Sequence, residues 1–193
     1  MLPRAWQQMH SLTASGGSDK VKYFAGFGYV KQDALYGDTR TNKSTSGFNR
    51  YNARVNIDAN IVDKYLNLSA DMAYRQEDRN SIAGSTSDVF NNMHRNPQTD
   101  PGRFPDGNLG KVSLGVNPIG LATEGGWVKD RKSVLNTRFM LDFNVPGLEG
   151  LNLKGIFSYD KIFNSIKRWT TPVDFYVWNK ITGCLLYTSD AAD

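Results

Sequence analysis

The clearest feature of the chain is a strict alternation of apolar and polar residues between positions 50 and 61. Every second position carries an apolar or aromatic side chain, and the positions between them carry only Arg, Asn and Asp. A helix of 3.6 residues per turn would mix the two sets on each face, whereas a strand separates them. The segment therefore predicts a strand with one apolar and one polar face. The apolar set is Tyr51, Ala53, Val55, Ile57, Ala59 and Ile61.

The same period of two recurs along the chain. It is clear at residues 21–31, 66–75, 135–144 and 151–160 and weaker at 9–15. We expect six antiparallel strands of about 10–12 residues, longer than the 5–6 typical of soluble sheets and close to the 9–11 of spanning strands. The predicted fold class is all-β, an antiparallel up-and-down transmembrane β-barrel segment. Six strands cannot close a barrel of the roughly 22-strand type, so we expect an open, curved sheet.

The connections between these strands alternate in length. Short turns are expected at 16–19, 62–64 and 146–150, and long polar segments at 32–47 and 76–132, with another beginning near Ile162. Short periplasmic turns and long extracellular loops are the plan of an outer-membrane barrel. This plan orients the strands, with the long segments outside the cell.

Tyrosine marks the outer end of most predicted apolar faces. Tyr29, Tyr51, Tyr74 and Tyr159 occupy this position, and the strand that begins near Ser133 has Leu135 there instead. A tyrosine ring at the membrane–water interface buries its body and keeps its hydroxyl in water. We therefore predict that these four tyrosines form an aromatic girdle at one membrane level.

Charged residues on the opposite faces are expected to line the barrel lumen. They can pair across neighbouring strands as a hydrated wall, or some can contact a plug or a passing substrate; both interpretations stay open, with the hydrated wall favoured. The predicted lumen-facing residues are Arg50, Arg54, Asp58, Asp71, Arg138 and Asp142, with Lys154 and Asp160 beside them.

Aromatic residues in the segments assigned to the cell exterior are candidate substrate contacts. Phe104, Trp127, Trp169 and Tyr176 could stack on sugar rings, or they could form small cores that large loops require. An alternative is that residues 174–178 begin the next spanning strand, which would move Trp178 into the barrel. The acidic and amide side chains of Asp100, Asp106 and Asn108 lack the spacing of a calcium loop, and the Pro-Asp-Gly at 105–107 indicates a turn. Whether a loop binds calcium stays open.

Composition narrows the function classes. The chain has 193 residues, 39% of them hydrophobic, and a net charge of +4. Its basic residues are scattered, so nucleic-acid binding is unsupported, and we find no catalytic constellation, cofactor motif or metal set.

The N-terminus lacks the apolar core of a signal peptide. Residues 184–193, CLLYTSDAAD, match one reading frame of a common sequencing adapter. We therefore expect a partial barrel domain over 1–183, truncated at both ends, followed by a non-native tail that contains the only cysteine, Cys184.

Several segments together resemble one family. SGGSDKVKYFAGFGYVKQDAL at 15–35, FNRYNARVNID at 48–58 and the later VFNNMHRNPQTDP and FPDGNLG are similar, in this order, to the SusC/RagA family of TonB-dependent outer-membrane transporters. The resemblance implies import of oligosaccharides or peptides across the outer membrane of a Gram-negative bacterium, beneath a SusD-like surface lipoprotein. It also implies a plug and a TonB-contacting segment, which nothing in this sequence matches.

The resemblance leaves two alternatives to a nutrient transporter. A soluble, secreted β-sandwich that binds glycans would bring two apolar faces together and keep the loop aromatics as its site. A siderophore receptor would share the barrel and differ in its ligand. The sequence does not identify the substrate, and enzymatic activity is the least supported class.

Overall fold

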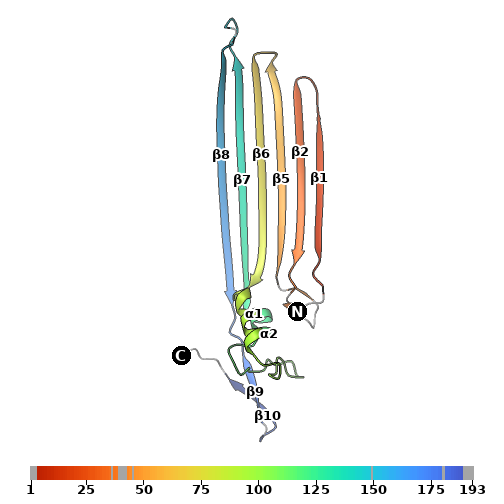
Figure 1. Ribbon diagram of the computed structural model, residues 1–193, viewed down its shortest axis with the longest axis vertical. Coiled ribbons are helices and arrows are strands. Elements are labelled where there is room, and N and C mark those ends of the chain that lie inside the picture. Colours follow the sequence, from red (N-terminus) through yellow and green to blue (C-terminus); the bar gives the residue numbers. More distant parts are fainter. Residues whose placement is uncertain are drawn as a thin grey trace.

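The computed structural model describes residues 4–35, 37–38, 43–44, 46–148, 150–179 and 181–188. A single antiparallel sheet of six strands dominates it, and every strand pairs with the strand that precedes it in that sheet (Figure 1). The strands are β1 (Gln7–Gly17), β2 (Val21–Asp33), β5 (Gly47–Val62), β6 (Leu66–Ile82), β7 (Gly126–Asn144) and β8 (Asn152–Thr170). This confirms the prediction of an all-β chain with six antiparallel strands in an open sheet.

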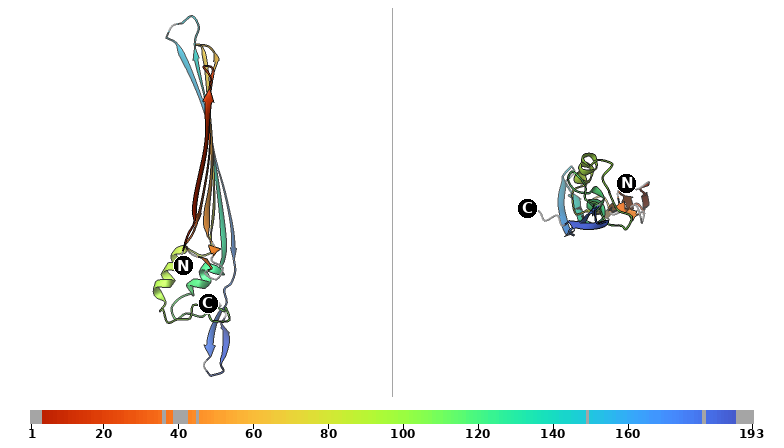
Figure 2. Two further views of the ribbon diagram at one scale, coloured as in Figure 1. Left: turned by 90° about the vertical axis from the view of Figure 1, so that its right-hand side faces the viewer. Right: turned by 90° about the horizontal axis from the view of Figure 1, so that it is seen from below.

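Smaller elements gather at one end of this sheet. Two short sheets are formed by β3 (Gly37–Asp38) with β4 (Lys43–Ser44) and by β9 (Phe175–Asn179) with β10 (Cys184–Thr188). The helices are α1 (Thr86–Arg95) and α2 (Pro118–Thr123). Figure 2 shows the large sheet as a thin, twisted layer, with both helices and the β9–β10 hairpin at the end opposite the tight turns. Neither helix in the described part of the chain is long and apolar enough to cross a membrane.

The strands extend well beyond their predicted outer ends. We expected about 10–12 residues per strand, but β5, β6, β7 and β8 contain 16, 17, 19 and 19. The connection expected at 76–132 shrinks to 83–125, and the loop expected from Ile162 is strand as far as Thr170. Here the hydrogen-bond ladder continues while each face mixes apolar and polar residues, so hydrophobic alternation stops marking the strand.

Residues 174–178, for which a further spanning strand was the alternative, contribute to a strand that lies outside the main sheet. Residues of β9 pair with β10 in a separate sheet, and the ladder with the main sheet ends at Thr170. Pro172 follows, which cannot donate a backbone hydrogen bond to a ladder. Phe175 is then buried beside Gly120 of α2. All of β10 lies in the adapter-like tail, so we assign no function to this hairpin.

Most of the buried apolar residues lie at the helical end, away from the middle of the main sheet. They include Ile82, Val89, Leu109, Val112, Ala122 and Phe175. In contrast, many large apolar side chains along the main sheet are exposed, including Val55, Phe139, Leu141 and Phe157. We call the helical end, residues 83–125, the loop layer. The sheet therefore presents an uncovered apolar surface, and the loop layer has its own small core.

Candidate functional site

The main sheet has two chemically different sides, and we name them by their residues. The tyrosine face carries Tyr29, Tyr51, Tyr74 and Tyr159, and the ion-pair face carries Arg54, Asp71, Arg138 and Asp160. Cross-strand pairing places each set on one side, because direct partners in a ladder share a face.

Asp71 is the centre of a hydrogen-bonded network on the ion-pair face. Its Oδ2 accepts hydrogen bonds from Nη2 and Nε of Arg138, at 2.8 and 3.2 Å. Its Oδ1 accepts a bond of 2.7 Å from Asn56 Nδ2, and Asn56 Oδ1 accepts one of 2.9 Å from Arg54 Nε. The network joins β5, β6 and β7 through charge-assisted bonds.

Further pairs continue this network toward β8. Asn136 donates a hydrogen bond of 2.7 Å to Asp160, and Lys154 Nζ lies 3.7 Å from Asp142 Oδ1. Asn136 and Asp160, together with Asp71 and Arg138, border a shallow hollow of about 310 Å³. The predicted pairing of opposite charges across strands is confirmed for Asp71 with Arg138 and for Asp142 with Lys154.

The two remaining charged residues predicted to face the lumen lie on the same side of β5. Asp58 is the direct cross-strand partner of Lys22 on β2. Arg50 lies opposite Val30 and Glu77, and its buried Nε has no hydrogen-bond partner among the described residues. The ion-pair face therefore carries all six residues that were predicted to line a lumen.

The tyrosines follow a diagonal across the sheet. Tyr29 and Tyr51 are direct partners, with ring centroids 5.1 Å apart. Tyr74 lies opposite Ala53, two residues nearer the tight turns, and Tyr159 lies in the row of Val55, four residues nearer. From β2 to β8 there are four strand-to-strand steps, about 19 Å across the sheet. Over that distance the tyrosines shift by four residues, about 13 Å along the strands, so the line through them makes an angle of about 35° with the hydrogen-bonded rows.

The tight turns shift in the same direction as the tyrosines. β2 begins in the row of Val21 and Ala59, whereas β5 continues three residues past this row to Val62. β7 likewise continues three residues past Leu141, which lies in the same row, to Asn144. In Figure 1 each hairpin tip lies farther from the helical end than the one before it, from β1–β2 to β7–β8. Both ends of the apolar band on the tyrosine face therefore run obliquely to the strands.

Beyond the tyrosines the same face becomes charged. Arg131 Nε donates a hydrogen bond of 2.6 Å to Asp78 Oδ1, between β7 and β6. Burial raises the pKa of Asp78, but hydrogen bonds from Arg131 and Gln76 outweigh burial and hold that pKa below its ordinary value. The bond to Asp78 also raises the pKa of Arg131. Asp78 lies four residues past Tyr74, outside the apolar band.

The aromatic residues proposed as substrate contacts fall into separate places. Trp127 and Trp169 are direct partners on β7 and β8, on strands where we expected loops. Both belong to the tyrosine face, so neither lies on the ion-pair face. Phe104 is half-buried in a turn of the loop layer, where its backbone N donates to Asn108 O at 2.8 Å. Tyr176 is on β9 and exchanges backbone hydrogen bonds with Leu109 and Lys111.

The loop layer is organised by asparagines that the sequence reasoning did not identify. Asn117 is only 1% exposed, and its Nδ2 donates bonds of 2.7 Å to the carbonyls of both Gly102 and Gly110. Its Oδ1 accepts a bond of 2.9 Å from Ile119 N and caps α2. The Asn-Pro pair at 117–118 was the available signal, because proline favours the first helical position after a capping residue.

Two further asparagines explain part of the VFNNMHRNP segment. Asn92 Oδ1 accepts a bond of 2.9 Å from Val116 N, and Asn96 Oδ1 accepts one of 3.1 Å from Leu114 N. The two residues are four apart on and just after α1, so both face the same stretch of loop. They hold residues 114–116 against the helix.

The carboxylates weighed for calcium have partners within the loop. Asp106 Oδ1 accepts a bond of 3.0 Å from Asn108 N, as expected for the Pro-Asp-Gly turn, and Gly107 there has φ of 95°. Asp100 accepts 2.7 Å bonds from the N and Oγ of Ser113. Among the described residues, no three acidic, histidine or cysteine side chains are grouped as a metal would require.

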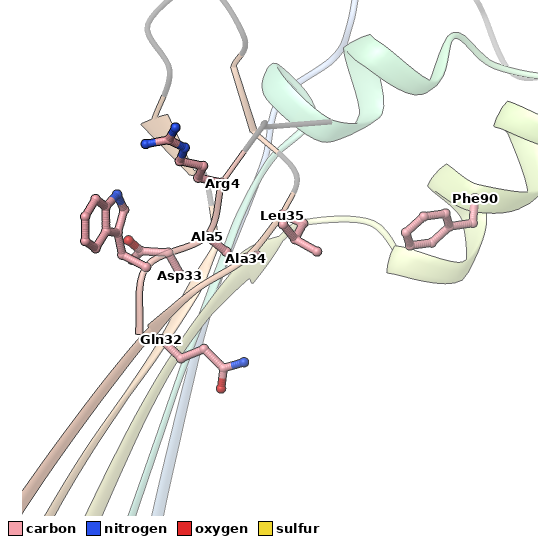
Figure 3. A pocket seen from close by; sticks show the side chains of 8 residues that line it. Arg4, Ala5, Gln32, Asp33, Ala34, Leu35 and Phe90 are labelled. Atoms are coloured by element: carbon pink, nitrogen blue, oxygen red, sulfur yellow. The ribbon is translucent and has the colours of Figure 1, made fainter. Parts of the chain in front are cut away.

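A second hollow lies between the outer ends of β1 and β2 and helix α1. It has a volume of about 680 Å³, and its lining includes Arg4, Trp6, Gln32, Leu35 and Phe90. In Figure 3, Leu35 and Phe90 lie on opposite sides of a wide gap, while Arg4 and Gln32 point away from each other. A specific small-molecule site needs a few convergent polar groups. This hollow lacks that convergence, and we assign it no ligand.

Comparison with known proteins adds no assignment, since no protein-family model and no curated protein matches the chain. The resemblance to SusC/RagA transporters therefore rests on the sequence segments quoted above. The geometry of the two faces carries the functional argument.

Proposed function

We propose that this chain forms part of the wall of a transmembrane β-barrel in the outer membrane of a Gram-negative bacterium. The barrel is a TonB-dependent transporter that imports oligosaccharides or other nutrients. In this proposal the tyrosine face meets lipid and the ion-pair face lines the lumen. The tight turns lie in the periplasm, and the loop layer lies outside the cell.

The observation that supports this proposal best is the oblique apolar band. Its outer boundary, drawn through the tyrosines, makes an angle of about 35° with the hydrogen-bonded rows, and spanning strands tilt by about 35–45°. On β5 the band runs from Tyr51 to Ile61. Ten residues at that tilt give a height of about 27 Å, close to the roughly 25 Å apolar band of known barrels.

The exposed apolar surface also favours a lipid environment over a soluble sandwich. Phe157 on the tyrosine face is 62% exposed, and Phe139 opposite it is 40% exposed. A sandwich would cover this face with a second sheet, and the described residues leave Phe139 and Phe157 uncovered. We therefore place the glycan-binding sandwich second. A siderophore receptor differs from our proposal in its substrate alone.

The proposed substrate and the proposed partners rest on the family resemblance. A hydrated ion-pair face is compatible with passage of polar solutes such as oligosaccharides. TonB and a SusD-like lipoprotein would act through other parts of the transporter. We propose no catalytic role for any residue.

A pair of adjacent substitutions tests which face meets lipid. In the full-length barrel protein that carries this sequence, Val55→Arg places a charge at mid-depth on the tyrosine face, at a cost of about 2–4 kcal/mol. Asn56→Arg places the same charge beside Asp71 on the ion-pair face. Folding is read from heat-modifiable gel mobility. We expect Val55→Arg to impair assembly and Asn56→Arg to leave it intact; equal tolerance of both contradicts the proposal.

A further inference from the structure

The outer ends of β7 and β8 carry a basic band on the tyrosine face. We define it by four cations, Lys129, Arg131, Lys161 and Lys167, and three aromatic residues, Trp127, Phe163 and Trp169. All four cations are exposed. The charges and rings alternate: Lys129 Nζ lies 4.7 Å from the Trp127 ring centroid, and Lys161 Nζ lies 4.9 Å from that of Phe163.

The charges of this band are not balanced within the sheet. Lys129 and Lys167 are direct cross-strand partners, an arrangement of like charges that destabilises a ladder. Asp78 is the only acidic side chain among the described residues of β6, β7 and β8 on this face, and it is already bonded to Arg131. On the ion-pair face, by contrast, Asp71 and Asp142 each have a basic partner. The basic band is therefore complementary to an anion from outside the chain.

We propose that the basic band binds the phosphorylated headgroup of an outer-leaflet glycolipid. This inference rests on the proposed function, because that function orients the tyrosine face toward lipid. Lysine and arginine attract lipid phosphates close to a membrane surface. Exposed Trp and Phe rings between the cations provide flat apolar surfaces for sugar rings. A phosphorylated glycolipid combines both chemical groups.

The height of the band favours a glycolipid over a phospholipid. Lys161 lies two residues beyond Tyr159, whereas Lys167 lies eight residues beyond it on the same strand. At a strand tilt of about 35° these offsets correspond to heights of roughly 5 and 20 Å above the tyrosines. Phospholipid headgroups extend only about 5–8 Å beyond the hydrocarbon core. A ligand that reaches Lys129 and Lys167 needs a longer polar head, as a chain of sugars provides.

Binding of purified lipids to the full-length barrel protein in detergent tests this proposal. The probes are a lipid A whose core sugars carry phosphate groups, the same glycolipid after dephosphorylation, and phosphatidylglycerol. Dissociation constants are measured by native mass spectrometry. We expect the phosphorylated glycolipid to bind at least roughly tenfold more tightly than either control, as charge and headgroup length require.

Matched double variants assign the binding to the basic band. Lys129→Gln with Lys167→Gln should weaken binding of the phosphorylated glycolipid by roughly 30-fold, the usual effect of losing two basic side chains near an anionic surface. Lys22→Gln with Lys154→Gln removes the same charge from the ion-pair face and should change that affinity by less than about twofold. Heat-modifiable mobility shows whether each variant has folded, and Lys129→Ala with Lys167→Ala replaces any variant that has not.

Three results overturn the inference while leaving the barrel intact. They are equal binding of the dephosphorylated glycolipid, equal binding of phosphatidylglycerol, and an unchanged affinity after loss of Lys129 and Lys167. A protein that co-purifies through these two lysines in place of lipid also overturns it. Failure of the unmodified protein to insert into any bilayer contradicts the proposed function itself, so the two failures are distinguishable.

Discussion

Asp71 and Arg138 are direct cross-strand partners, and the carboxylate accepts two hydrogen bonds from the guanidinium, at 2.8 and 3.2 Å. The side chains are 31% and 55% exposed, so water screens the pair. A double-mutant cycle with Asp71→Ala and Arg138→Ala should give a coupling free energy of about 0.5–1 kcal/mol, measured by urea unfolding of the full-length protein. Strictly additive effects would show that the pair is not formed.

Asn117 should be the most sensitive polar residue of the loop layer. Asn117→Ala removes three hydrogen bonds and leaves the carbonyl of the buried Gly110 without its donor, at a cost of about 2–4 kcal/mol. Hydrogen exchange of the α2 amides should become faster by two or more orders of magnitude. Asn108→Ala, which removes one exposed bond to Asp106, is the control and should leave exchange in α2 nearly unchanged. Equal exchange in both variants argues against this role of Asn117.

Close packing at Gly120 makes a second prediction for the loop layer. A Cβ at this position would lie 2.9 Å from both Leu109 Cδ1 and Val173 Cγ1. Gly120→Ala should therefore destabilise the loop layer by about 1–3 kcal/mol through overpacking. Gly84→Ala is the control, because nothing lies within 4 Å of a Cβ there. Limited proteolysis should cleave residues 97–123 faster in the first variant alone, and equal cleavage of both would contradict the packing.

The ion pair of Asp78 and Arg131 predicts a response to acid. The pKa of Asp78 is lower in the folded chain than its ordinary value of 3.8. The pair therefore stabilises the folded state above about pH 4, and this contribution is lost as the pH falls through the lowered pKa. Titration of the Asp78 carboxyl by NMR should give a midpoint below 3.8 that rises in Arg131→Gln. An unchanged midpoint in Arg131→Gln would exclude the pair.

The sequence predicted the alternating part of the sheet well and its outer part poorly. Between Tyr51 and Ile61 one face is apolar and the other polar, so periodicity located β5 and its neighbours. Beyond the tyrosines charged residues interrupt the apolar positions of the same face, as Asp78 and Lys129 illustrate, so a period of two in hydrophobicity no longer exists there. The additional cross-strand pairs at the outer ends of the strands, including Trp127 with Trp169, could be identified only from the strand pairing in the structure.

The candidate site, too, could be predicted from the sequence only in part. Alternation alone assigned Arg54, Asp71 and Arg138 to one face, because strand geometry decides that. Which charges pair depends on strand register, which sequence alone does not give. The two helices had local signals that were overlooked, a serine cap at Ser85 and the Asn-Pro pair at 117–118.

In the proposed barrel, one face of the sheet contacts lipid only as far as the tyrosines. Single cysteines at positions 157, 158 and 165 of β8 would carry an environment-sensitive fluorophore in the full-length protein in bilayers. We predict that position 157 is quenched by brominated lipid and shielded from aqueous iodide, while positions 158 and 165 show the reverse. Equal iodide quenching at 157 and 158 would contradict the account.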